Sequence, residues 1–117
     1  MLTRAESGLL AEDLAARFLA ARGLTIVKRN FRTRRGEIDL IARDGDVLVF
    51  VEVRLRTRAD YGGAAASITP GKQARLVAAA SQYLATLRTL PPCRFDALLL
   101  DALEPPRVEW LQDVIGV

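Results

Sequence analysis

The segment from Glu37 to Arg54, EIDLIARDGDVLVFVEVR, consists of two apolar stretches on either side of Asp44-Gly45-Asp46. An Asp-Gly pair between apolar stretches is typical of a tight turn that joins two antiparallel strands. The stretch after the turn is almost continuously apolar, which indicates a strand covered on both faces. We therefore predict paired strands over 37–43 and 47–54, the second of them buried.

Acidic side chains interrupt both predicted strands. Asp39 lies in the first strand and Glu52 in the second, where a charge is costly unless it is paired or binds a metal ion. With a turn at Asp44-Gly45, Asp39 is opposite Phe50 and diagonal to Glu52. With a turn at Gly45-Asp46, Asp39 faces Glu52 directly. Either register brings the two carboxylates close together on one face, whereas a three-residue loop without a bulge would separate them onto opposite faces.

Two carboxylates this close repel each other unless a cation lies between them. Mg²⁺ is usually held by one or two carboxylates, with waters and phosphate oxygens as its other ligands. Such an ion activates water for attack on a phosphodiester. The pattern therefore indicates a site for Mg²⁺ (or Mn²⁺) at Asp39 and Glu52. The alternative is a set of ordinary ion pairs, Glu52 with Arg54 or Asp39 with an arginine of a nearby loop.

The rest of the chain supplies elements on both sides of this strand pair. Hydrophobic spacing and turn residues predict a helix over 8–22, a strand over 24–32, a loop over 55–67, a helix from Thr69-Pro70 to about Thr89, a strand over 94–100, a turn over 104–106 and a strand or short element over 108–115. The order α-β-β-β-α-β-β predicts an α/β fold in which helices flank a central mixed sheet. The crossover through the second helix predicts parallel third and fourth strands. We expect one domain over residues 1–117.

Both predicted helices carry an apolar stripe with polar residues at its edge. In the first, Leu10, Leu14 and Phe18 recur at a spacing of four, and Glu12 falls beside the stripe, near the core. Lys72 and Gln73 lie in the first turn of the second helix, where a cation opposes the helix dipole. Contact with phosphate would explain why Lys72 and Gln73 lie at this position. The alternative is that Lys72 is simply an exposed lysine with no such role. The residues of this helix predicted to face inward are Leu76, Val77, Ala80, Tyr83, Leu84 and Leu87.

The composition excludes several classes of site. The chain contains no histidine and a single cysteine, Cys93. A Ser-His-Asp triad, a Cys-His nucleophile and a His-ligated zinc site are therefore excluded, and no internal disulfide can form. Catalysis would have to come from carboxylates, basic side chains, hydroxyls or a bound metal. No apolar run has the roughly 20 residues of a membrane span and no secretory signal is seen, so we expect no membrane partner and a cytoplasmic location.

Basic residues give the chain a net charge of +3, and all but Lys28 and Lys72 are arginines. The planar guanidinium group suits phosphate because it can donate two parallel hydrogen bonds. A GC-rich genome that favours arginine codons is the alternative explanation for the excess of arginine. Glu37 shares a face with Asp39, but it could equally neutralise a loop arginine, Arg34 or Arg35. The first half of the chain holds a basic block that we predict to contact phosphate: Lys28, Arg29, Arg32, Arg34, Arg35, Arg43, Arg54, Arg56 and Arg58.

Several short motifs in this order carry a resemblance to a known family. They are Ala11-Glu12, Asn30-Phe31-Arg32, Gly36-Glu37-Ile38-Asp39-Leu40-Ile41, Phe50-Val51-Glu52-Val53-Arg54, Tyr61-Gly62-Gly63-Ala64-Ala65-Ala66-Ser67, Lys72-Gln73 and Arg94-Phe95-Asp96. Together they resemble the YraN-like family of bacterial proteins, over roughly residues 8 to 113. That family is assigned to the restriction endonuclease-like superfamily. The resemblance implies a restriction endonuclease-like three-layer fold, similar to that of the archaeal Holliday-junction resolvases.

The resemblance also implies a set of site residues. The acids that would bind the metal ion are Glu12, Asp39 and Glu52. Arg54 stands where the superfamily pattern has a lysine, and Lys72 or Gln73 would match polar residues of the second helix. A lysine can accept a proton when its pKa shifts, whereas arginine stays protonated. Arg54 can therefore hold a phosphate oxygen but cannot act as a general base.

Three functions compete on this pattern. The first is a metal-dependent endonuclease that hydrolyses DNA phosphodiesters at branched or damaged DNA, in repair or recombination. Its catalytic residues would be Asp39, Glu52, Arg54, Lys72 and Gln73, and its nucleic-acid contacts Arg32, Arg34, Arg35, Arg56 and Arg58. The second, favoured by Arg54, is a non-catalytic nucleic-acid-binding module. The third is a protein-interaction domain whose acids form ion pairs only. A homodimer is expected if the substrate is a junction with two symmetric strands.

Overall fold

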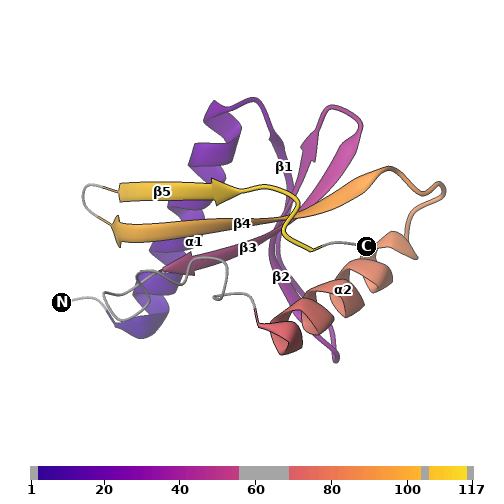
Figure 1. Cartoon of the computed structure of the whole chain (residues 1–117), viewed down its shortest axis with the longest axis horizontal. Helices are drawn as coiled ribbons and strands as arrows, with labels where there is room; N and C mark the ends of the chain where they lie inside the picture. Colours follow the sequence, from indigo (N-terminus) through magenta and orange to yellow (C-terminus); the bar gives the residue numbers. More distant parts are fainter. Residues whose placement is uncertain (1–2, 56–68, 104–105, 116–117) are drawn as a thin grey trace.

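A computed structural model describes residues 3–55, 69–103 and 106–115 of the chain. Its elements are α1 (Arg4–Ala21), β1 (Thr25–Arg32), β2 (Glu37–Asp44), β3 (Val47–Leu55), α2 (Pro70–Leu84), β4 (Cys93–Leu103) and β5 (Pro106–Leu111). The five strands form one sheet in the order β1-β2-β3-β4-β5 (Figure 1). β3 and β4 are parallel and the other neighbours are antiparallel. The predicted order of elements and the parallel pair are confirmed. The predicted loop over 55–67 and the turn over 104–106 lie largely outside the described residues.

The two helices cover opposite faces of the sheet. Alternate residues of β3 show this division, because Val49 and Val51 pack in the cluster of α1 while Leu48 and Phe50 pack in the cluster of α2. The period of two along a strand sends neighbouring side chains to opposite faces. β3 is therefore buried on both sides, as its apolar sequence predicted. The result is the three-layer α/β arrangement expected for a restriction endonuclease-like fold.

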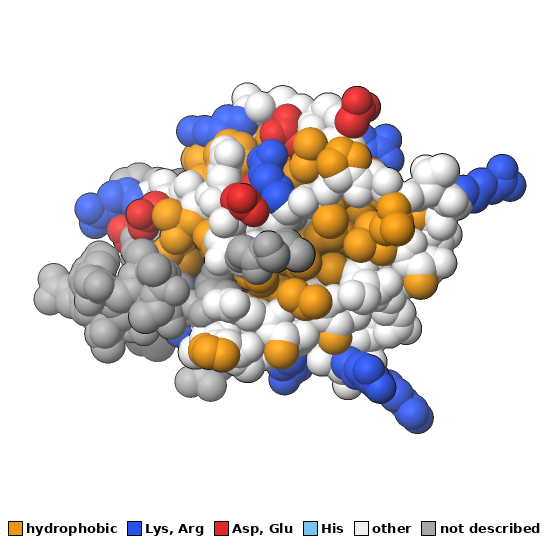
Figure 2. Space-filling view, turned by 45° about the vertical axis from the view of Figure 1, so that its right-hand side comes forward, with side chains coloured by type: hydrophobic (Ala, Val, Ile, Leu, Met, Phe, Trp, Pro, Cys, Tyr) orange, Lys and Arg blue, Asp and Glu red, His pale blue; other side chains and the backbone are white. Residues whose placement is uncertain are grey.

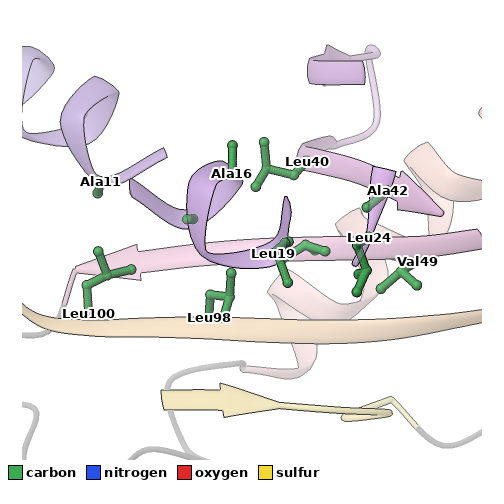
Figure 3. Packing of buried hydrophobic residues seen from close by; sticks show 11 residues of the cluster. Ala11, Ala16, Leu19, Leu24, Leu40, Ala42, Val49, Leu98 and Leu100 are labelled. Carbon is green, nitrogen blue, oxygen red and sulfur yellow. The ribbon is translucent and has the colours of Figure 1, made fainter. Parts of the chain in front are cut away.

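Small residues bring α1 close to the sheet. Figure 3 shows Ala11, Ala16 and Leu19 of this helix in one cluster with Leu98 and Leu100 of β4. Leu10, which belongs to the predicted apolar stripe, is 38% exposed, whereas Ala11, Ala15 and Ala16 are buried. The helix therefore packs through small side chains together with Leu19, and Leu14 and Phe18 lie against the same cluster.

The ends of three elements differ from the predictions. α1 begins at Arg4 rather than Gly8, because Thr3 caps it and Glu6 completes the capping box. α2 ends at Leu84 rather than near Thr89, and hydrogen bonds of the i to i−3 type turn the chain over the next residues. β5 covers Pro106–Leu111 rather than 108–115, because the chain leaves the sheet before Asp113, whose φ is +55°.

One predicted inward residue of α2 is wrong. Val77 is 40% exposed, whereas Leu76, Ala79 and Ala80 are buried. Two consecutive helical residues point about 100° apart, so the neighbour of a fully buried leucine falls towards solvent. Tyr83, Leu84 and Leu87 do pack against the cluster, as predicted.

Apolar residues of the C-terminal part are used mainly in packing. Val108 and Trp110 pack against the α1 cluster and Val114 against the α2 cluster. These three residues are therefore used in core packing. On the face turned forward in Figure 2, apolar side chains gather near the centre and Lys and Arg side chains project at the rim. Within the described residues, no helix is long and apolar enough to cross a membrane.

A buried acid ties the C-terminal part to the sheet. Asp96 on β4 is 1% exposed, and its carboxylate accepts hydrogen bonds from Arg94 Nε at 3.1 Å and Trp110 Nε1 at 2.9 Å. It also accepts from the backbone N–H of Asp113 at 2.9 Å. Arg94 extends the network to Asp44 at the end of β2, at 3.2 Å. Asp96 therefore has a structural role, holding β5 and the residues after it against β4.

Candidate functional site

Asp39 and Glu52 lie near each other where the pairing of β2 with β3 ends. The ladder pairs Asp44 with Val47 and Leu40 with Val51, so the next positions along are Asp39 and Glu52. The turn is therefore Gly45-Asp46, and Gly45 has the positive φ, +60°, that a two-residue type II′ turn requires at its first position. Of the two registers left open by the sequence, the one with the Gly45-Asp46 turn is the one that forms. The backbone N–H of Val53 donates to Asp39 Oδ2 at 2.8 Å and fixes the carboxylate.

Burial and neighbouring charge raise the pKa of both carboxyl groups. For Asp39, burial is the main cause and the charges of Glu12 and Glu37 add to it, while the Val53 N–H and Arg32 oppose them. The result is a pKa of about 6 for Asp39, against an ordinary value of 3.8. Asp39 thus lies in the field of two further acids as well as opposite Glu52.

The pKa of Glu52 is raised further. Burial is again the main cause, followed by repulsion from Asp39, and Glu37 adds to the effect. Lys72 and Arg54 lower the pKa, yet it remains at about 7. The site therefore holds two acidic groups whose negative charges are incompletely balanced by the surrounding residues. A group of this kind in a cleft is a recognised candidate for function.

Glu12 approaches this pair from α1 and is held by an amide. Asn30 Nδ2 donates to Glu12 Oε1 at 2.8 Å. Since the charge of Glu12 contributes to the raised pKa of Asp39, the two carboxylates lie within electrostatic reach. Within the described residues, however, no three acids or cysteines converge tightly enough to form a ready-made metal cage. The three-acid metal site remains a prediction, with Asp39 and Glu52 as its centre.

A cleft of about 160 Å³ opens beside the acids. Its lining combines acidic and basic side chains with one apolar residue: Glu37, Glu52, Lys72, Arg75 and Leu76. The basic residues come from the first two turns of α2, which starts at the Thr69 cap and Pro70 as predicted. Carboxylates on one wall and cations on the other can accept a phosphate group whose charge is shared with a metal ion.

Close packing fixes the position of that wall. Gly36, directly before β2, touches the backbone of α2 so closely that a Cβ atom there would overlap the carbonyl of Arg75. The turn between β1 and β2 is thereby held against the helix that carries Lys72. This contact sets the width of the cleft between Glu37 and Arg75.

The remaining predicted site residues are placed less centrally. Arg54 is half-buried on β3, two positions beyond Glu52, and its charge favours the ionised form of that acid. Gln73 is half-buried in the first turn of α2 and lies outside the cleft lining. The catalytic roles predicted for Arg54 and Gln73 therefore remain predictions.

The predicted phosphate-binding arginines divide into two groups. Arg34 and Arg35 are exposed in the turn beside Gly36, on the side of the molecule where the cleft opens. Arg32 lies 3.6 Å from Glu37 across β1 and β2, so Glu37 pairs with Arg32 rather than with the two turn arginines. Arg56 and Arg58 lie outside the described residues. The two turn arginines are thus exposed for contact with a large anion.

Two residues of the site were not predicted from the sequence. Asn30 was noticed only as part of a family motif, and Arg75 was given no role. The spacing of Lys72 and Arg75, three residues apart on one helix face, is a signal that could have identified the second basic residue. Asn30 offered no comparable signal, because its contact lies 18 residues away in the chain.

The donor set suits a hard divalent ion. Asp39 and Glu52 present carboxylate oxygens from neighbouring strands, and one or two carboxylates are what Mg²⁺ usually takes from a protein. Burial, and after it the charge of neighbouring acids, raises the pKa of both groups, and a cation placed between them would favour their ionised forms. The residues present therefore fit Mg²⁺ or Mn²⁺, whose other ligands would be water and substrate oxygens.

Comparison with known proteins identifies relatives of the chain. A family model described as "Uncharacterised protein family UPF0102" matches residues 11–100. A protein of that family from Nitrosospira multiformis is 53% identical over 94% of this chain and 92% of its own length. One from Cupriavidus taiwanensis is 57% identical over 94% of this chain and 82% of its own. One from Ralstonia pickettii is 50% identical over 97% of this chain and 92% of its own.

Proposed function

The chain belongs to the uncharacterised protein family UPF0102, and we propose that it is a divalent-cation-dependent nuclease that hydrolyses DNA phosphodiesters. The family relationship confirms the YraN-like resemblance found in the motifs. The name of the family assigns no activity, so the proposal comes from the site.

The observation that carries the proposal is the closeness of Asp39 and Glu52 beside a cleft whose lining includes Lys72 and Arg75. Both carboxyl groups have raised pKa values, about 6 and about 7, mainly because they are buried. A fold gains nothing in stability from two such groups facing each other, since ionising them costs free energy. An arrangement that costs stability and lies in a cleft is typical of a functional site.

Each side chain has a distinct task in this proposal. Asp39 and Glu52 would hold Mg²⁺ or Mn²⁺, and Glu12 would add a third negative charge. The bound ion would lower the pKa of a water and offset the charge that develops on the phosphate. Lys72 and Arg75 would bind the phosphate from the opposite wall of the cleft. The exposed arginines of the turn, Arg34 and Arg35, would contact the flanking backbone of the nucleic acid.

Arg54 limits how protons can move in the site. Its guanidinium remains protonated and therefore cannot accept the proton of an attacking water. The carboxylates that line the cleft, Glu37 and Glu52, are the groups able to do so. Arg54 would instead stabilise negative charge on the phosphate, as a fixed positive charge close to the reacting atoms.

A non-catalytic nucleic-acid-binding module is the second candidate, and Arg54 is the observation that favours it. The same arginines would contact DNA, and the acids would bind a cation that bridges to phosphate without cleavage. Binding would then be strongly salt-dependent, because each neutralised phosphate releases counterions.

Cleavage assays on linear, nicked, flapped and four-way DNA with Mg²⁺ or Mn²⁺ test the proposal. We expect the wild type to cleave at least one of these substrates, and Asp39→Asn and Glu52→Gln to lower the rate by roughly 100-fold or more, since a metal ion supplies several kcal/mol of charge stabilisation. The matched control is Asp46→Asn, which removes an exposed acid at the other end of the same hairpin. It should leave the rate unchanged.

Two outcomes would overturn the proposal. Cleavage that survives in Asp39→Asn at the wild-type rate would mean that another site is responsible. Failure of the wild type to cleave any substrate, together with salt-dependent DNA binding, would assign the chain to the non-catalytic alternative. The stability of the same variants is measured as well, so that a lower cleavage rate caused by the loss of a metal ligand is distinguished from one caused by unfolding.

A further inference from the structure

We propose that Asn30 is a positioning residue that holds the Glu12 carboxylate beside Asp39, so that Glu12 serves as the third acid of the cation site. This inference rests on the proposed function of the site. Three observations carry it: the place of Asn30 in the sheet, its backbone conformation and the partner of its side chain.

Asn30 lies in the same row of the sheet as the two central acids. Its neighbours Arg29 and Phe31 pair with Leu40 and Ile38, which leaves Asn30 opposite Asp39. In turn Asp39 and Glu52 are the positions that follow the last β2–β3 pair, Leu40 with Val51. One line across β1, β2 and β3 therefore contains an amide and two carboxylates. A side chain at this position lies next to whatever binds between the acids.

The backbone of Asn30 is left-handed inside a strand. Its φ is +53°, and the residues on both sides continue the ladder with β2. This conformation costs a non-glycine residue free energy, although asparagine tolerates it better than most residues do. Such local strain persists where surrounding contacts determine it, and it gathers at functional sites. The hydrogen bond from the Asn30 side chain to Glu12 of α1 is a contact that can hold Asn30 in this conformation.

The partner of Asn30 is an acid, and the bond leaves its charge intact. Asn30 Nδ2 donates to Glu12 Oε1 at 2.8 Å. A carboxylate has about four acceptor positions, so one donated hydrogen bond leaves the others available for a cation. An arginine or lysine at residue 30 would have held Glu12 equally well but would have neutralised it. The amide orients the acid and preserves its negative charge near Asp39.

The neighbouring acid of α1 shows the contrast. Asp13 lies 3.0 Å from Arg17 and 3.5 Å from Arg29, so its charge is balanced by two guanidinium groups. Consecutive acids on one helix therefore have opposite electrostatic environments: Asp13 is paired with cations, and Glu12 is bound by a neutral donor. This difference is expected if Glu12 contributes charge to a metal site and Asp13 does not.

Binding of Mn²⁺ to the purified full chain, measured by calorimetry and by electron paramagnetic resonance, tests the inference without any activity assay. The variant is Asn30→Gly, because glycine accepts a positive φ and removes only the side chain. We expect Mn²⁺ to bind this variant about 10-fold more weakly than the wild type, the usual effect of losing a residue that orients a metal ligand. Asp13→Asn is the matched control and should bind as the wild type does.

A double-variant cycle separates positioning from a general structural role. If Asn30 acts through Glu12, Asn30→Gly should have no additional effect on Mn²⁺ affinity in a Glu12→Gln background. Additive weakening in that background would contradict the inference, and so would a wild-type affinity in Asn30→Gly alone. Both results leave the proposed function standing. A wild type that binds no Mn²⁺ would instead overturn the proposed function itself.

Discussion

Glu52→Gln replaces a partly buried carboxylate by a neutral side chain of the same shape, and we expect it to stabilise the fold at pH 8. The pKa of Glu52 is raised from 4.5 to about 7, chiefly by burial and then by Asp39. Such a pKa means that ionised Glu52 costs the folded state about 3 kcal/mol above pH 7. Removing the charge should recover most of that free energy, which corresponds to an increase in Tm on the order of 10 °C.

The sign of the pH dependence follows from the direction of the shift. Between pH 4.5 and about 7 the folded chain holds a proton on Glu52 that the unfolded chain has released. This group therefore contributes stability that is fully present below the lower value and is lost as the pH rises through the upper one. Asp39 behaves in the same way between 3.8 and about 6. The advantage of Glu52→Gln should accordingly be small at pH 4 and reach its full size at pH 8.

Urea unfolding followed by circular dichroism between pH 4 and pH 9 measures this difference directly. The control Asp46→Asn removes an exposed charge and should change the free energy of unfolding by less than about 0.5 kcal/mol at every pH. Added Mn²⁺ should reverse the order at pH 8, since an ion that binds only the folded wild type stabilises it by mass action. A stability difference that is independent of pH, or a Glu52→Gln variant less stable than the wild type at pH 8, would refute the electrostatic reasoning.

Two further predictions concern the contacts that support the site. Gly36→Ala should destabilise the fold by about 1–3 kcal/mol in urea unfolding, because the new methyl group overlaps the backbone of Arg75. The control Gly8→Ala adds a methyl group in open space within α1 and should be neutral or slightly stabilising. Equal effects of the two substitutions on stability would contradict the argument. Asp96→Asn should cost about 3 kcal/mol by breaking a buried ion pair, and the emission of the single tryptophan, Trp110, should shift as its hydrogen bond is altered. An unchanged emission spectrum and stability would show that the Asp96 network is dispensable.

The order of elements and the fold class could be predicted from the sequence because they depend on local patterns. Apolar spacing, the turn residues around Gly45 and the Thr69-Pro70 helix start act over a few neighbouring residues. Strand parity likewise placed Asp39 and Glu52 on a common face in either two-residue register. These inferences needed no knowledge of which segments meet in space.

The rest of the site depended on tertiary contacts. The choice between the two turn registers was settled by the pairing of β2 with β3 from Asp44–Val47 to Leu40–Val51, which brings Asp39 and Glu52 together at its end. The approach of Gly36 to α2, the network around Asp96 and the bond from Asn30 to Glu12 join segments that are distant in the chain. Local preferences carry no information about such contacts, because they exist only once the helices have packed on the sheet. The sequence by itself therefore determined which acids could share a face, and the packed structure decided how they are paired, buried and held.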